Sequence, residues 1–415
     1  MLEKGWDVAI IGAGPAGLKA AILCAGAGLR TLVLDGSKTI GAKLLISGGG
    51  RCNVTNRKVS EKDYQSGDLR TVRNILRAFP PERTLEFFTD LGVEMALEEG
   101  TKYFPKEQSA KVVLRALLQA AQRAGVVIKQ GEKVKTVSKE RGTFQVSGEG
   151  FEHLAKTLVI ATGGLSYPGT GSDGSGYLLA KSLGHSLVPA TPALTPLITD
   201  DRDWKSLAGI TLPVELFAIV DGKKSSRSKG ALLFTHIGFS GPAVLDISGS
   251  WLRCRAQRKE LRVNFFSEKT EEDLSDEWAR LVEEHPDRSW KRALAQYLPE
   301  RLVEVLLKKS DIDPSERLDQ ISKKGRELFL RSLFRFSLPV TGFQGYEKAE
   351  VTAGGVDLLE VDAKTLASNL CARLFFAGEV LDVDGRIGGF NFQWAWASGT
   401  VVGQAIVRGV RDDQA

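Results

Sequence analysis

The sequence contains few cysteines and histidines and no long apolar run. Its four cysteines and four histidines, among 415 residues, show no C-x-x-C pair and no metal-ligand spacing. This excludes a disulfide scaffold and argues against a structural zinc site. No apolar stretch reaches the roughly 18 to 20 residues that cross a bilayer. The first apolar segment is interrupted at Gly12, too early for the apolar core of a signal peptide. We therefore expect a reducing compartment, a cytoplasmic location and no membrane partner.

Length and charge are those of an ordinary globular protein. Hydrophobic residues make up 42% of the chain and charged residues 26%, and 56 basic residues stand against 51 acidic ones. At roughly 150 residues per domain, the length predicts two or three domains, each with a core of its own. The net charge of +5 permits an anionic ligand or a nucleic acid partner without requiring one.

The predicted elements alternate as in an α/β fold that is interrupted once. A strand, a glycine-rich turn, a helix and a strand occupy residues 8–34, and helical patterns follow around residues 69–91 and 109–124. Three prolines between Pro189 and Pro196 mark a boundary. Short strands and then charged, leucine-rich helices follow, before buried strand patterns return. We expect four segments, at 1–190 (first part of the α/β domain), 191–266 (inserted β part), 267–340 (inserted helical part) and 341–415 (second part of the α/β domain).

The first glycine-rich turn carries a dinucleotide-binding pattern. It reads Gly12-Ala13-Gly14-Pro15-Ala16-Gly17, directly after a strand and at the start of a helix. Gly12 suits the tight turn, Gly14 lets backbone N–H groups approach a pyrophosphate, and Gly17 lets helix and strand pack closely. Asp35 ends the next strand and can accept the hydroxyls of an adenosine ribose. The full strand, helix, strand and acid context predicts a dinucleotide site.

The far end of the chain distinguishes FAD from a nicotinamide dinucleotide. A buried strand ends at Gly378 and Glu379, and Asp382 and a predicted helix from Asn391 follow. A carboxylate at the carboxyl edge of a strand can hold the ribityl chain that only a flavin possesses. A helix N-terminus at the flavin pyrimidine edge would stabilise the negative charge of the reduced ring. A nicotinamide cofactor requires neither feature, so the sequence favours FAD.

Two further glycine-rich segments indicate a close approach of backbone to a ligand. Ser47–Asn53 includes three consecutive glycines, which lose much conformational entropy on folding and suit a backbone that must come close to another group. Thr162, Gly163 and Gly164 follow a buried strand and form a turn suited to closing over the adenosine half. Gly169–Gly174 also matches G-x-G-x-x-G, but several residues separate it from its strand, so we predict no second nucleotide site there.

Six motifs, in order, resemble one known family. They are GAGPAG, GAKLLISGGGRCNVTN, LVIATGGLSYP, LLFTHIGFSGPAVLDIS, EVTAGGV and FFAGEVLDVDGRIGGFNFQWAWASG. The chain resembles the BaiN and YhiN (RdsA) type family of NAD(P)/FAD-dependent oxidoreductases over nearly its whole length. The resemblance implies an α/β fold: a glutathione-reductase-like, FAD-binding Rossmann domain interrupted by an inserted β-barrel-like part and a helical part.

The resemblance also implies which residues bind FAD. On the ADP half it places Gly12, Gly14, Pro15, Ala16, Gly17, Asp35 and Gly36, with the backbone of Val134 near the adenine. Along the pyrophosphate and isoalloxazine it places Lys43, Ser47, Gly48, Gly49, Gly50, Arg51, Cys52 and Asn53. Near the ribityl chain, the pyrimidine edge and the reactive face it places Gly378, Glu379, Asp382, Gly389, Asn391, Phe392, Thr352, Gly354 and Gly355.

The activity implied is that of a reductase, which passes hydride from NAD(P)H through FAD to an activated C=C bond. Members of the family act on unsaturated steroid thioesters or on uracil within ribosomal RNA, so a small molecule or ribosomal RNA is the expected substrate. With no second full Rossmann unit, NAD(P)H would bind transiently or at the substrate cleft. An FAD-dependent amine oxidase of the aminoacetone-oxidase type, and a non-catalytic FAD-containing module that binds RNA, are the alternatives.

The insertion and the glycine loop supply the remaining candidate groups. Basic residues at 223–229, 308–309 and 323–326 would bind RNA phosphates or simply be solvated. Cys52 and His236 are the candidate catalytic residues, with Tyr103 and Tyr346 as weaker candidates for the proton donor. Arg51 beside Cys52 is expected to lower the pKa of the thiol. The alternatives are a buried, inert thiol and a structural histidine.

Overall fold

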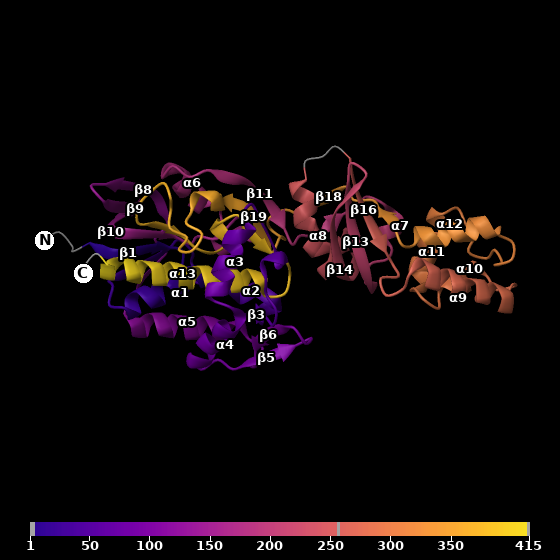
Figure 1. Ribbon diagram of the computed structural model, residues 1–415, viewed down its shortest axis with the longest axis horizontal. Coiled ribbons are helices and arrows are strands. Elements are labelled where there is room, and N and C mark those ends of the chain that lie inside the picture. The colour runs from indigo at the N-terminus through magenta and orange to yellow at the C-terminus, as the bar shows by residue number, and fades with distance from the viewer. Residues whose placement is uncertain (1–4, 255–257, 413–415) are drawn as a thin grey trace. The chain divides into compact units, whose positions relative to one another are not determined.

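The computed structural model describes residues 5–254 and 258–412 and divides the chain into two compact units (Figure 1). The first unit contains residues up to Pro192 together with those from Tyr346 onward, so both ends of the chain contribute to it. The second unit is the internal segment Ala193–Gly345. Each unit has its own cluster of buried apolar side chains. The finer division of the internal segment into a β part and a helical part stays a prediction.

A parallel sheet forms the centre of the first unit. Its strand order is β7-β2-β1-β10, and β20 pairs with the C-terminal part of β10. The N-terminal part of β10 pairs antiparallel with β9, which pairs with β8. Both faces of the parallel strands are covered, and this explains their nearly continuous apolar sequences. The bounds are β1 Trp6–Ile11, β2 Thr31–Asp35, β7 Val127–Gln130, β8 Val134–Glu140, β9 Thr143–Gly148, β10 Phe151–Ile160 and β20 Leu374–Phe376.

Two helices from opposite ends of the sequence pack against each other in this unit (Figure 1). They are α1 (Pro15–Gly26) and α13 (Phe390–Asp412). A Cβ atom at Gly399 would lie 2.4 Å from the carbonyl oxygen of Ala16, and one at Gly403 would lie 2.9 Å from the Cβ of Leu23. Glycine at these two positions therefore allows the backbones of the helices to approach closely.

The other elements of the first unit surround this core. The helical pattern around residues 69–91 forms two helices, α3 and α4, because Pro80 and Pro81 interrupt the hydrogen-bond ladder. The bounds are α2 Ala42–Gly50, β3 Thr55–Asn56, η1 Glu61–Asp63, β4 Tyr64–Ser66, α3 Leu69–Ala78, α4 Pro81–Asp90, β5 Met95–Glu98, β6 Lys102–Pro105, α5 Ala110–Ala124, η2 Pro168–Thr170, α6 Ser175–Ser182, β11 Leu187–Ala193, β19 Val351–Val356, η3 Leu358–Glu360, η4 Gly378–Val380 and β21 Val383–Gly385.

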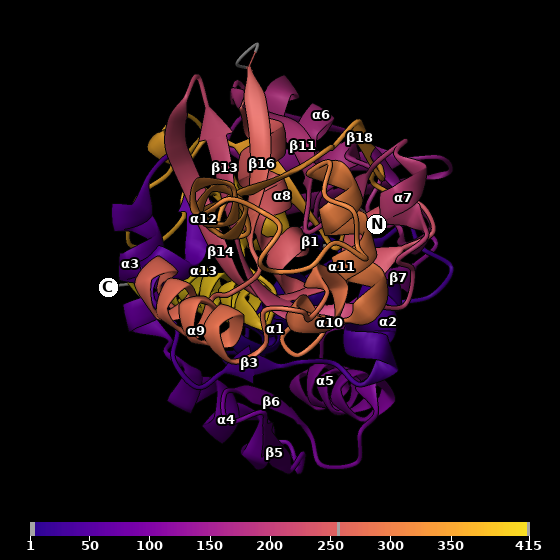
Figure 2. The ribbon, with the colours of Figure 1, turned by 90° about the vertical axis from the view of Figure 1, so that its right-hand side faces the viewer.

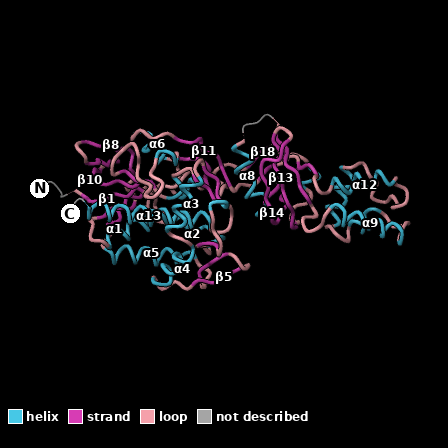
Figure 3. The backbone as a smooth tube through the Cα atoms, viewed as in Figure 1, coloured by secondary structure: helices cyan, strands magenta, loops and turns pink. Residues whose placement is uncertain are grey.

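The second unit consists of an antiparallel sheet and helices (Figure 3). The strand order is β17-β16-β13-β14-β15-β12-β18, and α8 packs on β13 and β14. No helix within the described residues is long and apolar enough to cross a membrane. The bounds are β12 Leu197–Ile198, α7 Arg202–Lys205, β13 Thr211–Val220, β14 Lys223–Thr235, β15 Gly238–Ser240, α8 Pro242–Arg253, β16 Lys259–Asn264, α9 Glu271–Glu284, α10 Trp290–Leu294, α11 Glu300–Lys309, α12 Lys323–Ser332, β17 Phe336–Leu338 and β18 Gly342–Phe343.

Candidate cofactor site

The first glycine-rich turn lies between β1 and α1, and its three glycines have different surroundings. A Cβ atom at Gly12 would lie 2.4 Å from the carbonyl oxygen of Ala161, and one at Gly17 would lie 2.0 Å from that of Gly12. A Cβ atom at Gly14 would meet no atom within 4 Å. Packing therefore requires glycine at positions 12 and 17, whereas Gly14 borders open space at the start of α1. The first N–H groups of a helix have no intrahelical acceptor, so a phosphate is favoured in this space.

The carboxylate of Asp35 joins the end of β2 to the same turn. Its Oδ2 atom accepts a hydrogen bond from the Ala13 N–H at 2.7 Å, and its Oδ1 atom accepts one from the Ser37 N–H at 2.8 Å. A carboxylate offers about four acceptor positions, so ribose hydroxyls can bind the remaining ones. A Cβ atom at Gly36 would lie 2.7 Å from the Cβ of Lys133, which brings the start of β8, and with it Val134, to this end of β2.

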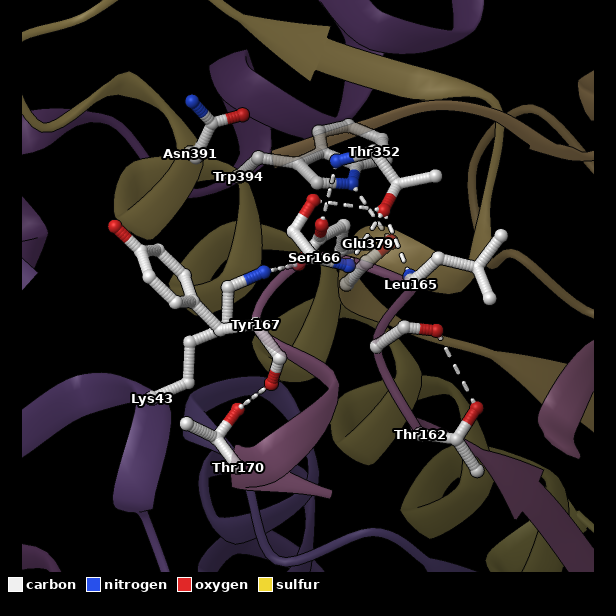
Figure 4. Close-up of polar contacts among 12 residues, drawn as sticks. Lys43, Thr162, Leu165, Ser166, Tyr167, Thr170, Thr352, Glu379, Asn391 and Trp394 are labelled. Atoms are coloured by element: carbon white, nitrogen blue, oxygen red, sulfur yellow. Dashed lines mark hydrogen bonds and ion pairs between the residues drawn. The ribbon is translucent and has the colours of Figure 1, made fainter. Parts of the chain in front are cut away.

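A salt bridge connects the two ends of the chain in the middle of the site (Figure 4). The Lys43 ammonium of α2 lies 2.6 Å from Oε2 of Glu379 in η4. The Oε1 atom of Glu379 accepts a hydrogen bond from the N–H of Thr352 in β19 at 2.8 Å. The Thr352 hydroxyl oxygen accepts bonds from the N–H groups of Leu165 at 2.7 Å and Ser166 at 3.1 Å. Four chain segments are thus held around Glu379, the predicted ribityl-binding acid.

A buried tyrosine hydroxyl beside this network has no hydrogen-bond partner. Tyr177 of α6 is buried, and no partner of its Oη atom is found in the described part of the chain. Burial, and then the charge of Glu379, raises the pKa of this phenol, so it stays protonated. A Cβ atom at Gly164 would lie 3.1 Å from the Tyr177 Oη atom and 2.4 Å from the Thr352 hydroxyl oxygen. An unpaired buried hydroxyl costs about 1 to 3 kcal/mol, which a ligand oxygen would offset.

The second glycine-rich segment leaves the helical conformation within α2. Ser47 has extended backbone angles, and Gly48, Gly49 and Gly50 have φ values of 55°, 68° and 84°. Only glycine adopts three left-handed conformations in a row at little cost. A Cβ atom at Gly49 would meet nothing within 4 Å. The predicted need for three glycines therefore has a conformational basis, and the loop leaves space beside Gly49.

The structure favours the second of the two predicted alternatives for Cys52, a buried and inert thiol. The Arg51 guanidinium donates to Glu98 Oε2 and to Gln108 Oε1, both at 3.0 Å, and lies over the ring of Phe104 at 4.2 Å. Cys52 is fully buried, and burial raises the pKa of its thiol to about 12. The expectation that Arg51 lowers this pKa is therefore wrong, and Cys52 has the properties of an inert buried thiol.

The start of α13 is fixed against the loop that follows α2. With its amide oriented to satisfy its neighbours, Asn53 accepts a hydrogen bond from the Gly389 N–H at 3.2 Å and donates to the carbonyls of Tyr103 at 3.2 Å and Thr55 at 3.0 Å. The Asn391 amide exchanges two 2.8 Å hydrogen bonds with the backbone of Gly385. These contacts hold the N-terminus of α13, whose dipole favours a negative charge.

Tertiary structure gathers most of the predicted residues in the first unit, with two qualifications. His236 lies in the second unit, exposed in the turn between β14 and β15, and its catalytic role stays a prediction. A Cβ atom at Gly354 would lie 2.5 Å from the carbonyl oxygen of Pro189, and one at Gly355 would lie 2.5 Å from that of Val380. Backbone packing alone therefore explains these two glycines, whatever their place beside a flavin.

The site contains one residue that sequence reasoning missed. Tyr177 follows the rejected pattern Gly169–Gly174 and has no motif of its own. Its unpaired state depends on the packing of α6 beneath the loop after β10 and could not be deduced from its neighbours in the sequence.

Comparison with known proteins identifies the family. A family described as the HI0933-like protein Rossmann domain matches residues 6–405. The ribosomal RNA dihydrouridine synthase of Escherichia coli (strain K12) is 33% identical over 405 residues, which cover 97% of this chain and 98% of that protein. The 3-dehydro-bile acid delta(4,6)-reductase of Clostridium scindens is 32% identical over 402 residues, covering 96% of this chain and 98% of that protein.

The fold is also found among solved structures. The Mycobacterium smegmatis Sdh1 complex in the apo form has a TM-score of 0.50 and 17% identity, with 98% of this chain and 68% of that chain covered. The predicted α/β Rossmann fold class and the predicted family are confirmed. The chain belongs to the HI0933-like Rossmann family, the family of NAD(P)/FAD-dependent oxidoreductases that its motifs resemble.

Proposed function

We propose that this protein binds FAD and reduces an activated C=C bond with hydride from NAD(P)H, and that its substrate is uracil in ribosomal RNA. The name of the Escherichia coli relative supports this substrate. The observation that most supports FAD as the cofactor is the contact of Lys43 with Glu379 and, through Glu379, with Thr352. It joins segments from both ends of the chain around the acid predicted to hold a ribityl chain.

Different residues of the site would contact different parts of the cofactor. The open side of the turn at Gly14 would receive the pyrophosphate, and Asp35 the adenosine ribose. Glu379 would accept ribityl hydroxyls, and the Tyr177 hydroxyl would gain the partner that it lacks. The N-terminus of α13 would lie at the pyrimidine edge. When bound, FAD supplies a carrier that takes two electrons from NAD(P)H as hydride and delivers them to carbon.

The conjugation of uracil determines which carbon accepts the hydride and which accepts the proton. The C5=C6 bond is conjugated with the C4 carbonyl, so C6 accepts the hydride and C5 then takes a proton, which gives 5,6-dihydrouracil and NAD(P)⁺. The base must leave its stack to reach a protein pocket. His236 is the candidate proton donor to be tested, because the buried thiol of Cys52 has no exposed surface from which to act.

The test is a reconstituted reaction. Purified protein is reduced with NADPH or NADH without air while the flavin absorbance is followed. Ribosomal RNA transcribed in vitro, and hence free of modified nucleosides, is then added, and dihydrouridine is measured by mass spectrometry. We expect bleaching by one of the nicotinamides and dihydrouridine in the RNA. Bleaching by a small amine in place of a nicotinamide would indicate an oxidase, and bleaching by neither would indicate a binding module.

A second substrate class has support from the Clostridium scindens relative, which is named as a bile acid reductase. The same hydride transfer would then reach a C=C bond conjugated with a ketone or thioester. A matched reaction with an unsaturated 3-keto steroid in place of RNA separates the two. Reoxidation of the reduced flavin by the steroid, with no dihydrouridine formed in RNA, would overturn the RNA proposal and leave the reductase.

A further inference from the structure

The three basic segments of the second unit differ in whether their charges are free. Lys308 lies 2.7 Å from Asp203, and Lys309 lies 2.6 Å from Asp201 and 3.0 Å from Asp203. Two lysines thus face two carboxylates, and their charges cancel. Residues 308–309 therefore offer little attraction to a phosphate.

The hairpin of β13 and β14 has the opposite character. Lys223 and Lys224 follow the turn at Asp221 and Gly222, and both are exposed. The Lys224 ammonium lies over the ring of Phe217 at 3.6 Å, a contact that keeps its charge at the surface. The Arg227 side chain is 73% exposed, and its contact with the carboxylate of Glu215 is a loose 3.8 Å. These three charges remain available to a ligand.

The start of β16 lies at the same end of the sheet as the hairpin (Figure 2). It carries two cations, Arg258 and Lys259. Lys259 is the Cα partner of Val220, the last residue of β13, and the Asp221 N–H donates to the carbonyl of Arg258 at 3.1 Å. Arg258 is exposed. We call residues 221–227 and 258–260 the hairpin-end surface. It holds five cationic side chains and two carboxylates, those of Asp221 and Glu260.

The two carboxylates do not cancel this excess. With the flanking residues Arg262, 2.7 Å from Glu260, and Glu215, 3.8 Å from Arg227, the surface has six cations and three carboxylates, an excess of three positive charges. The described residues at the hairpin end include none of the exposed large apolar side chains of this unit, which are Ile237, Leu328 and Phe343. A membrane-binding surface would combine cations with apolar side chains that enter the lipid. Cations without such side chains are typical of a surface that contacts a phosphate backbone.

We infer that the hairpin-end surface binds the phosphate backbone of an RNA substrate. The inference rests on the proposed function and extends it, because it assigns the RNA contact to the largest of the basic clusters. The hairpin-end surface holds five cationic side chains, whereas residues 323–326 hold three, of which Arg326 already donates to the Leu318 carbonyl at 2.9 Å. The contacts would position the RNA and would not read its sequence, since lysine and arginine at a backbone carry no base information.

The test compares three double variants with the same change in charge. They are Lys223→Gln with Arg258→Gln at the hairpin end, Lys308→Gln with Lys309→Gln at the paired segment, and Lys323→Gln with Lys324→Gln at the exposed start of α12. Binding of in vitro transcribed ribosomal RNA is measured by fluorescence anisotropy between about 50 and 300 mM salt. Each phosphate contact contributes about 0.7 (single strand) to 0.9 (duplex) to the slope of log affinity against log salt.

We expect the hairpin-end variant to bind RNA at least about tenfold more weakly at physiological salt, with a slope smaller by about 2. The other two variants should bind like the unmodified protein. All three should unfold at the same temperature and have flavin reduced by nicotinamide at the same rate. Equal losses in all three variants, or a loss only at 323–324, would overturn the assignment, as would binding to anionic lipid vesicles in place of RNA.

Failure of this inference is distinguishable from failure of the proposed function. If the unmodified protein forms dihydrouridine and the hairpin-end variant binds RNA normally, the surface assignment is wrong and the activity stands. If the unmodified protein binds RNA through the hairpin end but forms no dihydrouridine, the surface stands and the activity is wrong. A protein that binds no RNA overturns both.

Discussion

Lys43 and Glu379 form a 2.6 Å ion pair across 336 positions of the sequence. The side chains are only partly exposed, at 26% and 19%, so solvent screens the pair less than an ordinary surface pair. The contact fixes α2 against η4, two of the elements that carry predicted FAD-binding residues. The cofactor site therefore depends on a long-range contact between the chain's first and last segments.

Glu379→Gln is expected to weaken FAD binding. The amide keeps the shape of the side chain but loses the charge that holds Lys43 and that is proposed to accept ribityl hydroxyls. We expect the dissociation constant of FAD to rise about 10- to 100-fold, or about 1.4 to 2.7 kcal/mol, measured by flavin fluorescence on titration into cofactor-free protein. Glu61→Gln is the control, because it removes a 3.0 Å ion pair with Arg73 in the same unit, and neither residue is a predicted FAD contact. Equal weakening in both variants would contradict a specific role for Glu379.

Tyr177→Phe is expected to change the cofactor-free and FAD-bound proteins in opposite directions. Removing an unpaired buried hydroxyl should stabilise the cofactor-free protein by about 1 kcal/mol or more, whereas FAD should bind more weakly. Thermal unfolding with and without FAD measures both effects.

The control for this variant is a paired tyrosine. The Tyr64 hydroxyl donates to the carbonyl of Phe390 at 2.8 Å, so Tyr64→Phe should destabilise the cofactor-free protein. If Tyr177→Phe also lowers its unfolding temperature, the hydroxyl has a partner within the protein and the proposed contact with FAD is lost.

Two alanine substitutions in one turn should have different outcomes. Gly17→Ala places a Cβ atom 2.0 Å from the Gly12 carbonyl oxygen, and we expect a loss of about 3 kcal/mol or more of folding stability. Gly14→Ala meets no atom within 4 Å, so the protein should fold but bind FAD at least about 100-fold more weakly, because the methyl group occupies the space for the pyrophosphate.

Gly26→Ala serves as the control for both, since its Cβ atom also meets nothing within 4 Å and lies at the far end of α1. Circular dichroism and FAD titration distinguish the three variants. Normal FAD affinity in Gly14→Ala would place the cofactor elsewhere.

A buried lysine gives a prediction about pH. Lys19 of α1 is only 3% exposed, and its ammonium lies 3.1 Å from the centre of the Phe87 ring. Burial lowers the pKa of Lys19 from the ordinary value of 10.5 to about 7, although the ring favours the charged form by up to about 2 kcal/mol. Unfolding therefore takes up a proton between about pH 7 and 10.5, and the contribution of Lys19 to folding stability rises with pH across this range.

Lys19→Met should remove this dependence. The variant should be more stable than the unmodified protein at pH 7, and the difference should shrink toward pH 10. Urea unfolding at several pH values measures it, with Lys111→Met as the control because Lys111 is exposed on α5. A constant difference from pH 7 to pH 10 would show that Lys19 does not titrate in this range.

The fold could be predicted from local patterns, because glycines, prolines and buried strands act over short distances. Gly12 and Gly17 follow from the strand and helix on either side of them. The break between α3 and α4 was not predicted, although Pro80 and Pro81 cause it locally. The α/β class is confirmed for the same reason. The FAD contacts assigned to individual residues stay predictions.

The side-chain partners in the candidate site could not be predicted in the same way. Arg51 adjoins Cys52 in the sequence, but its guanidinium turns to Glu98 and Gln108, and burial then dominates the pKa of the thiol. The hydrogen bonds of Thr352 and the unpaired hydroxyl of Tyr177 depend on packing between distant segments. The position of Arg51 next to Cys52 in the sequence therefore does not predict the pKa of the thiol, because that pKa depends on the residues that surround Cys52 in the folded protein.

The pairing of β20 with β10 and of α13 with α1 has a consequence for synthesis in the cell. A chain emerging from the ribosome presents β10 and α1 long before their partners exist, while the internal unit is continuous and can fold during translation. Until the final helix is released, the edge of the central sheet and one side of α1 stay open to water and to other chains. We therefore expect nascent or truncated forms that lack the last helix to depend on chaperones, and cofactor loading to be the final event in maturation.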